Sequence, residues 1–282
     1  MHDHSDTLIR LALSEDIGDG DVTARYFIPE SRRARAFVTV RMDGMVSGVE
    51  IAARVFTAVD AALDVEILIP DGSRVAAGAL LIRVEGSARS ILTAERVALN
   101  FLQRLSGVAT LTAAYVEQVK GTGARILDTR KTTPGYRLLE KQAVVHGGGE
   151  NHRLGLYDRA MVKDNHLVAE GGPDVIQAAI RRLKADKPRV EVELEADTIG
   201  QVKDFLAMEG VDYILLDNMS LEELHEAVEL RGERVRPQLE ASGGITLETL
   251  RDIAATGVDF VSAGALTHSA PALDVGLDFE PI

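Results

Sequence analysis

The sequence predicts an α/β protein in which an N-terminal α+β module precedes a β/α barrel. Three observations support this prediction. The pattern of the chain changes near residue 105, from mixed strand and helix signals to short apolar runs that alternate with amphipathic stretches. Most of these runs end in polar residues or glycine, as parallel strands joined by helices do. A basic segment at residues 125–163 stands out in an otherwise acidic chain.

The first 105 residues are expected to form the α+β module. Its expected elements are a helix at 7–15, a strand at 34–41, helices at 51–62 and 90–105, and a P-D-G-S turn at 70–73. The acidic glycine loop at 15–23 is interpreted as a turn, because it lacks the ligand spacing and the distant glutamate of an EF-hand calcium site. The stretch 71–86 looks like half of a biotinyl or lipoyl carrier domain. Because no lysine occurs between Met1 and Arg104, we interpret it as shared architecture without carrier function.

Residues 106–269 are expected to form the barrel. The candidate strands are residues 125–128, 160–163, 190–195, 213–217, 238–242 and 260–264. The candidate helices are residues 173–184, with a proline near the start, 199–208, 221–230 and 247–255. Short apolar strands are typical of a parallel sheet covered by helices. Ser220 and Glu223 fit a capping box ahead of the third helix, and the alternation predicts a closed or nearly closed barrel.

Composition excludes several classes of protein. With 282 residues, 46% of them hydrophobic, the chain has the composition of a globular protein of one large or two ordinary domains. The absence of cysteine excludes disulfides, thiolate metal sites and cysteine nucleophiles. No apolar run approaches the ~20 residues of a membrane span, and the first residues lack the basic and apolar regions of a signal peptide. We therefore expect a cytoplasmic protein that does not bind membranes.

The basic segment predicts a ligand class. Between Arg125 and Lys163, eight Arg or Lys accompany four Asp or Glu, whereas the whole chain has a formal net charge of −13. A chain that is acidic overall but gathers cations beside glycines and histidines is expected to bind a small polyanion in a cleft. Nucleic acid usually requires a broad basic face, and a pI of about 5.0 argues against one.

The candidate strands end in residues with useful chemistry. In barrels of this kind the active site lies at the carboxyl ends of the strands. The residues at or near these ends are Arg130, Lys131, Lys163, Glu193, Glu195, Asp217, Ser242, Gly243, Gly244, Gly264 and His268. A single charged residue after a strand is usually a solvated loop side chain. Strand ends that carry complementary chemistry in succession predict a site instead.

Cationic residues form one part of the expected site. Arg130, Lys131, Arg153 and Lys163 suit a substrate with several negative groups, because Arg and Lys side chains bind carboxylate and phosphate. A lysine at a strand end could instead be the Schiff-base lysine of an aldolase-like enzyme. Two lysines among arginines are better suited to binding anions, so we favour an anion site.

Carboxylates form a second part. Glu193 and Asp217 are hard oxygen ligands that could hold Mg²⁺ bridging to phosphates, directly or through water. We expect Glu191 or Glu195 on the opposite strand face from Glu193. If the strand register differs, Glu195 joins Glu193 in the site.

Glycine-rich turns form a third part. The SGG sequence at 242–244 and the AGA sequence at 263–265 leave backbone amides able to approach a phosphate near a helix start, with Thr246 as a possible cap. A GxxxxGK[ST] loop is absent, which argues against a P-loop nucleotide hydrolase. Together the three parts predict a phosphorylated sugar, a metal and a second, carboxylated reactant.

A series of motifs carries a resemblance to a known family. The motifs are DTRKTTPG, GGGENHRLGLYD, KDNH, VEVELE, ILLDNM, EASGGI and GALTHSAPALD, in that order, with NFLQRLSGVAT and the loop EDIGDGDVT before them. Over nearly its whole length the chain resembles quinolinate phosphoribosyltransferases, also called nicotinate-nucleotide pyrophosphorylases (carboxylating). The resemblance implies the type II phosphoribosyltransferase fold. In that fold, residues 1–105 would form an α/β sandwich joined by the tail 270–282, and residues 106–269 an incomplete, seven-stranded β/α barrel.

The resemblance also implies an activity and a site. Quinolinate and 5-phosphoribosyl-1-pyrophosphate would give nicotinate mononucleotide, pyrophosphate and CO₂, a step of de novo NAD synthesis. The catalytic residues would be Lys131, Lys163, Glu193 and Asp217, with Mg²⁺ on the side of Glu193 and Asp217. Arg130, His152 and Arg153, with Lys131 and Lys163, would surround the two quinolinate carboxylates. Ser242, Gly243, Gly264 and His268 would hold phosphate, and Thr129 and Gly244 complete the substrate-binding residues. Arg104 would enter the neighbouring subunit's site, which makes a homodimer the functional minimum.

One alternative shares the fold. The molybdate-transport-associated branch of the family departs from the TRKTTPG and KDNH patterns. This chain keeps both patterns, so phosphoribosyl transfer is favoured.

Overall fold

The chain divides into two compact units. The computed structural model describes residues 4–163 and 172–281. The first unit comprises Met1–Ala113, Thr133–Gly148 and Ser269–Ile282, and the second comprises Ala114–Thr132 and Gly149–His268. None of the helices in the described part of the chain is long and apolar enough to cross a membrane.

These limits differ from the predicted domains of residues 1–105 and 106–269. The helix expected at 90–105 is longer, α4 (Ala88–Gln118), so the change of pattern near residue 105 does not mark a break in structure. A further helix, α5 (Arg137–His146), belongs to the first unit. There Tyr136 stacks on Phe101 with ring centroids 5.5 Å apart. The barrel sequence is therefore interrupted by a segment that packs on residues far before it.

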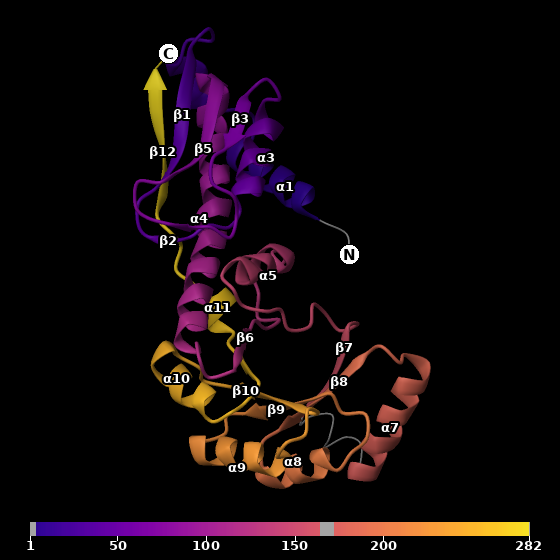
Figure 1. Cartoon of the computed structure of the whole chain (residues 1–282). Helices are drawn as coiled ribbons and strands as arrows, with labels where there is room; N and C mark the ends of the chain where they lie inside the picture. The colour runs from indigo at the N-terminus through magenta and orange to yellow at the C-terminus, as the bar shows by residue number, and fades with distance from the viewer. Residues whose placement is uncertain (1–3, 164–171, 282) are drawn as a thin grey trace. The chain divides into compact units, whose positions relative to one another are not determined.

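An antiparallel sheet with helices forms the first unit. Its strands are β1 (Arg33–Val40), β3 (Asp64–Ile67), β5 (Leu80–Ser87) and β12 (Val275–Pro281), in the order β12-β1-β5-β3, and β2 (Gly44–Met45) pairs with β4 (Arg74–Val75). Its helices are α1 (Ser5–Ile17), α2 (Val22–Phe27), α3 (Val49–Val59), α5 and most of α4 (Figure 1). The pairing of β12 with β1 brings the C-terminal tail into this sheet.

Burial of apolar side chains explains how this unit packs. Val38 on β1 and Val55 and Phe56 on α3 are completely buried, and α3 packs against β3 and β5. The acidic loop at 15–23 leads into a helix cap, because Asp21 Oδ1 accepts a hydrogen bond from the Ala24 amide at 2.8 Å. Only residues 18–21 of this segment lie between α1 and α2, because 15–17 and 22–23 belong to the two helices.

The second unit is an open parallel β/α barrel. Its strands are β6 (Arg125–Leu127), β7 (Arg159–Val162), β8 (Glu191–Ala196), β9 (Tyr213–Asp217), β10 (Gln238–Ser242) and β11 (Phe260–Ser262), in the order β6-β11-β10-β9-β8-β7. All neighbours pair in parallel, and β6 and β7 are the two edges. The prediction of an incomplete barrel is therefore confirmed. Its expected seven strands are not, since the described residues form six and Glu150 adds an isolated bridge to Leu127.

Helices cover the outside of this sheet. They are α7 (Pro173–Asp186), α8 (Ile199–Leu206), α9 (Leu221–Arg231) and α10 (Leu247–Ala255), and a short α11 (Ala265–His268) follows β11 (Figure 1). Pro173 occupies the first turn of α7, and Ser220 and Glu223 form the capping box of α9, both as predicted. Thr246 is the N-cap residue of α10.

The period of the strands decides which side chains face the inside of the barrel. Residues two apart on a strand share a face. On β9, Leu215 and Asp217 line a cavity. Ile214 and Leu216, on the opposite face, are completely buried. β9 thus contributes one face to the core and the other to a potential site.

Candidate active site

The carboxyl ends of the barrel strands surround a cavity of about 460 Å³. Its lining residues are Thr129, Arg130, Lys131, His152, Arg153, Met161, Lys163, Glu195, Leu215, Asp217, Asn218, Glu240, Ser242, Gly243, Gly244 and Ser262. Most of the residues predicted for the site are among them. The strand ends that the sequence singled out therefore meet around one space.

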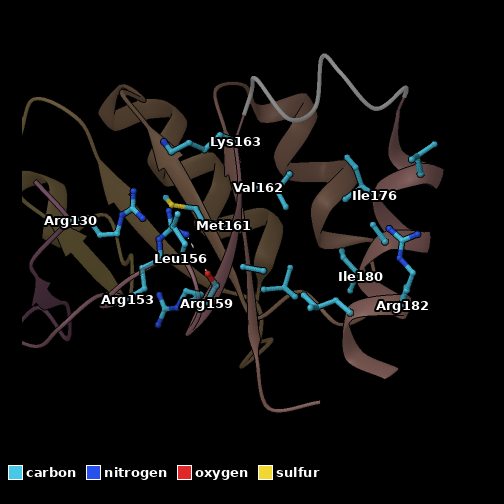
Figure 2. A pocket seen from close by; sticks show the side chains of 15 residues that line it. Arg130, Arg153, Leu156, Arg159, Met161, Val162, Lys163, Ile176, Ile180 and Arg182 are labelled. Carbon is cyan, nitrogen blue, oxygen red and sulfur yellow. Dashed lines mark hydrogen bonds between the residues drawn. The ribbon is translucent and has the colours of Figure 1, made fainter. Parts of the chain in front are cut away.

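Three cations form one wall of the cavity. Arg130 follows β6, Arg153 follows the bridge of Glu150, and Lys163 follows β7. They also line a second cavity of about 570 Å³ beside β7 and α7. Figure 2 shows these three side chains on one side of β7, with the apolar Ile176 and Ile180 of α7 on the other. Burial and the nearby charge of Arg130 lower the pKa of the Arg153 guanidinium, and a bound anion would offset both effects.

A hydrogen bond joins the loop that follows β6 to the short helix α11. Thr267 Oγ1 donates a hydrogen bond to the carbonyl of Lys131 at 2.8 Å. A Cβ added at Gly264 would lie 3.0 Å from Lys131 Cδ and 3.1 Å from His268 Nε2. Glycine at this position thus allows the lysine and histidine side chains to approach each other. Lys131 lines the cavity, and phosphate binding by Gly264 and His268 stays a prediction.

A glycine turn follows β10 and also lines the cavity. Asp217 ends β9 and pairs in register with Ser242, which ends β10. Gly243 and Gly244 follow with φ angles of 93° and 60°, a conformation that glycine adopts without strain. Turns of this kind can direct backbone N–H groups at an anion.

His152 and Glu240, which line the cavity, belong to a buried cluster of charged groups. The imidazole Nε2 of His152 is 3.0 Å from Glu193 Oε2 and 3.5 Å from Glu240 Oε2, and Arg159 is 3.6 Å from Glu193. Both carboxylate side chains are completely buried. The His152 amide donates to Asp128 Oδ1, and the Arg153 amide donates to His152 Nδ1. These backbone contacts fix the orientation of the imidazole ring.

The cluster shifts the pKa of each member. Burial disfavours a charged imidazole, but the hydrogen bond to Glu193 and the charges of Glu240 and Glu193 raise the pKa of His152 overall. Burial alone would raise the pKa of Glu193, yet its contacts with His152 and Arg159 lower it. Burial and the negative charge of Glu193 raise the pKa of Glu240 to about 8. At neutral pH these shifts favour a protonated Glu240 beside an ionised Glu193.

The expected separation of the three glutamates of β8 is wrong. Glu191 contacts Arg159 and Tyr213, Glu193 contacts His152, and Glu195 contacts Lys163 at 2.5 Å. All three lie on the same face because they are two residues apart. Glu195 lines the cavity, whereas Glu193 lies in the buried cluster.

The same period would have found the lining residues that the sequence reasoning missed. These residues are Met161, Leu215, Glu240 and Ser262. Each stands two positions before a residue predicted for the site, at 163, 217, 242 and 264. Because alternate strand residues share a face, each predicted strand end should have been extended back by two residues. Asn218 could have been included for a different reason, because it directly follows the predicted site residue Asp217.

Two predictions fall outside this unit or outside the described residues. Arg104 lies in the first unit, where it donates to Glu140 Oε1 at 2.8 Å and to the Ala270 carbonyl at 3.0 Å. Asp164, Asn165 and His166 of the KDNH motif lie outside the described residues.

The cavity offers carboxylates suited to Mg²⁺. Asp217 and Glu195 line it and present the hard oxygen atoms that Mg²⁺ prefers. One ligand atom each from His152, Glu193 and Glu240 also lies within 4.8 Å of the others. The positive charge of Arg159, 3.6 Å from Glu193, disfavours a cation in that buried cluster. The role of Glu193 in holding a metal stays a prediction.

Family models and curated relatives match this chain over most of its length. The chain matches the family models "Quinolinate phosphoribosyl transferase, N-terminal domain" over residues 21–106 and "C-terminal domain" over residues 108–278. It is 44% identical to quinolinate phosphoribosyltransferase [decarboxylating] 1b of Nicotiana tabacum, over 97% of this chain and 81% of that one. It is 43% identical to nicotinate-nucleotide pyrophosphorylase [carboxylating] of Mycobacterium leprae, over 96% and 95%.

Solved structures show the same similarity. The nicotinate-nucleotide pyrophosphorylase of Francisella tularensis superposes with a TM-score of 0.90 at 37% identity, covering 98% of this chain and 96% of that one. The two family models together match residues 21–106 and 108–278 of this chain. This chain belongs to the quinolinate phosphoribosyltransferase family.

Proposed function

We propose that this chain transfers the phosphoribosyl group of 5-phosphoribosyl-1-pyrophosphate to quinolinate, giving nicotinate mononucleotide, pyrophosphate and CO₂ for de novo NAD synthesis. Two relatives are named for a decarboxylating transferase and for a carboxylating nucleotide pyrophosphorylase, which are the two directions of this reaction. The family match favours this activity over the Schiff-base aldolase. The names of the relatives favour it over the molybdate-associated branch, which shares the fold.

One observation carries the proposal. Arg130, Arg153 and Lys163 line the same cavity as Asp217 and the glycine turn at 243–244. A dicarboxylate would occupy the cationic side, because arginine binds carboxylates through paired hydrogen bonds. A phosphorylated sugar would occupy the side of the carboxylate and the glycine turn. The two reacting atoms would then face each other in one space.

The reaction requires no nucleophilic side chain. The pyridine nitrogen forms a bond to the ribose carbon as the bond to pyrophosphate breaks, and the ring becomes cationic. The adjacent carboxylate then leaves as CO₂, and the electrons that remain beside the positive nitrogen take up a proton. Arg130 and Arg153 orient the ring through its carboxylates. Lys131 would stabilise the negative charge of the departing pyrophosphate.

We also propose that the reaction uses Mg²⁺, held at the cavity by Asp217. Bound there, Mg²⁺ would neutralise charge on the pyrophosphate group. The carboxylate oxygens at the cavity support this proposal. Titration of turnover with Mg²⁺ in EDTA-treated enzyme tests it, and unchanged turnover without a divalent ion would contradict it.

The decisive assay compares two pyridine substrates. The purified chain is incubated with phosphoribosyl pyrophosphate, Mg²⁺ and either quinolinate or nicotinate. We expect nicotinate mononucleotide and an equal amount of CO₂ from quinolinate alone. Turnover of nicotinate instead would overturn the proposal, because the cationic wall would then serve a single carboxylate.

A homodimer is proposed as the functional unit, with Arg104 entering the neighbouring site. A mixing experiment tests this arrangement. We expect Arg104→Ala and Lys131→Ala protomers to be inactive alone, whereas a hybrid dimer has one site with neither change if Arg104 acts on the partner. Recovered turnover on mixing supports action across the interface. No recovery in dimers shown to exchange subunits contradicts it.

The cytoplasmic location stays a prediction. The absence of cysteine fits a reducing compartment. Fractionation of cells that express the chain tests it.

A further inference from the structure

Asn218 has an unusual backbone conformation at the edge of the cavity. Its φ angle is 54°, and it is the single positive-φ residue other than glycine in the part of the chain that the structure describes. Left-handed conformations are unfavourable for residues with a Cβ, although asparagine tolerates them better than most. Strained residues of this kind concentrate at functional sites, where surrounding contacts hold them in place.

Two hydrogen bonds hold Asn218 in this conformation. Its backbone N–H donates to the Ser242 carbonyl at 2.9 Å, which extends the pairing of β9 with β10 by one bond. Its side-chain Nδ2 donates to Asp217 Oδ2 at 3.0 Å. The left-handed turn thus directs the carboxamide back toward the carboxylate of the preceding residue.

The same carboxamide lies against the glycine turn. A Cβ added at Gly243 would be 2.2 Å from Asn218 Oδ1 and 2.5 Å from Asn218 Cγ, so only glycine leaves room for the asparagine side chain. Gly243 also has a positive φ angle of 93°. One side chain therefore contacts both the carboxylate of Asp217 and the backbone of the turn at 243–244. All of these residues line the cavity.

We propose that Asn218 is a positioning residue that holds the Asp217 carboxylate and the Gly243–Gly244 turn at a fixed separation for the phosphoribosyl substrate. The proposal rests on the proposed function, because it assigns this side of the cavity to the sugar phosphate. Asn218 needs no contact with the reacting atoms. Its effect passes through Asp217 and through the turn, so the pyridine dicarboxylate on the cationic side should be little affected.

The first test separates the two substrates. Asn218→Gly removes the carboxamide while keeping a residue that adopts positive φ without strain. We expect the KM for phosphoribosyl pyrophosphate to rise about tenfold with a fall in kcat, as for misplaced groups near a reacting centre. The KM for quinolinate should change by less than about twofold, because the arginine contacts are intact. Equal changes in both KM values, or none in either, would overturn the proposal.

Ser220→Ala is the matched control. Ser220 is two residues further along and caps α9. Its loss destabilises the same loop without touching the carboxamide. If Asn218→Gly and Ser220→Ala give the same kinetic pattern, Asn218 has only a structural role. Wild-type enzyme without any turnover of quinolinate would instead contradict the proposed function, which distinguishes the two failures.

A second test does not depend on activity. Gly243→Ala would force its Cβ against Asn218 Oδ1, so it should lower the midpoint of thermal unfolding in the wild-type background. In the Asn218→Gly background that clash is absent. The midpoint of thermal unfolding should then fall less, because only the strain of alanine at positive φ remains. A non-additive cycle of this kind reports direct contact. Additive shifts in the midpoint would overturn the proposed packing of Asn218 on the turn.

Discussion

Charged groups at the amino ends of the barrel strands are paired within the chain, whereas those at the carboxyl ends line a cavity. At the amino ends, Asp212 and Asp259 each precede a strand, and each accepts a hydrogen bond from the second residue of a neighbouring strand, Val192 N–H at 2.9 Å and Leu239 N–H at 2.7 Å. Each of the two also pairs with cations of the chain, Lys184 and Arg236 for Asp212 and Arg231 for Asp259. The carboxylates of Asp212 and Asp259 therefore have their partners within the chain itself.

Together with Asp212, Asp259 and their partners, two cation–aromatic contacts form what we call the amino-end layer. The guanidinium of Arg125 lies 4.1 Å from the ring centroid of Phe260, and that of Arg159 lies 4.1 Å from the centroid of Tyr213. At the carboxyl ends, by contrast, Arg130, Arg153 and Lys163 gather around a cavity. In barrels of this kind, the amino ends contribute stability and the carboxyl ends contribute chemistry. Substitutions at the two ends should therefore separate stability from activity.

The largest effect is expected for Arg153→Ala. Removing the guanidinium should lower kcat/KM for quinolinate by about 10²–10³-fold, because a half-buried cation that we propose to bind a substrate carboxylate is lost. Arg153→Lys should recover part of the lost kcat/KM, because lysine keeps the positive charge but lacks the paired N–H groups of the guanidinium. Steady-state kinetics and thermal unfolding measure both properties. The exposed Arg181 of α7 is the matched control, and an equal loss in Arg181→Ala would contradict a specific role.

Asp259→Ala should give the opposite result. It leaves Arg231, whose side chain is 13% exposed, and the Leu239 amide without this partner. We expect the free energy of unfolding to fall by about 2–4 kcal/mol. At a temperature where the variant is folded, kcat/KM should stay within about twofold of wild type. Urea unfolding tests this, with Asp252→Ala on the exposed face of α10 as control. Loss of activity in folded enzyme would contradict the separation of the two ends.

The amino-end layer also predicts a pH dependence of stability. Burial would raise the pKa of Asp212, but its bonds to Lys184 and the Val192 amide lower it overall. A carboxyl whose folded pKa is depressed stabilises the fold above its unfolded pKa, about 3.9. That contribution is lost as the pH falls through the folded value. Asp212→Asn should therefore cost about 1–2 kcal/mol near neutral pH and progressively less below about pH 4. A difference in unfolding free energy that is constant with pH would contradict this origin.

Much of the barrel could be predicted from the sequence because its elements follow local rules. Apolar runs of strand length, the proline at 173 and the capping pair at 220 and 223 each act within a few residues. The placement of α5 in the first unit could not be predicted, because it depends on packing of Tyr136 on Phe101 across 35 positions of sequence. Seven strands were expected, whereas the described residues form six, and beside β6 there is only one isolated bridge, from Leu127 to Glu150.

The site was predicted less completely than the fold. Charged residues after strands were found because they interrupt apolar runs, whereas Glu240 was missed because it lies inside one. Its neighbours on the sheet, not its position in sequence, place it beside Glu193 and His152. Contacts between side chains of different strands depend on the closure of the sheet. Single-sequence patterns carry no direct signal for them.

The smallest expected effect tests whether every residue at the carboxyl ends serves chemistry. Ser220 follows the site residues of β9, but its side chain accepts a hydrogen bond from the Glu223 amide and caps α9. Ser220→Ala should lower the free energy of unfolding by about 1 kcal/mol and leave both KM values unchanged. Urea unfolding and steady-state kinetics measure the two quantities. A changed KM without a loss of stability would show that the capping residue belongs to the binding site. The residues that contact substrate would then extend past Asn218 to the N-terminus of α9.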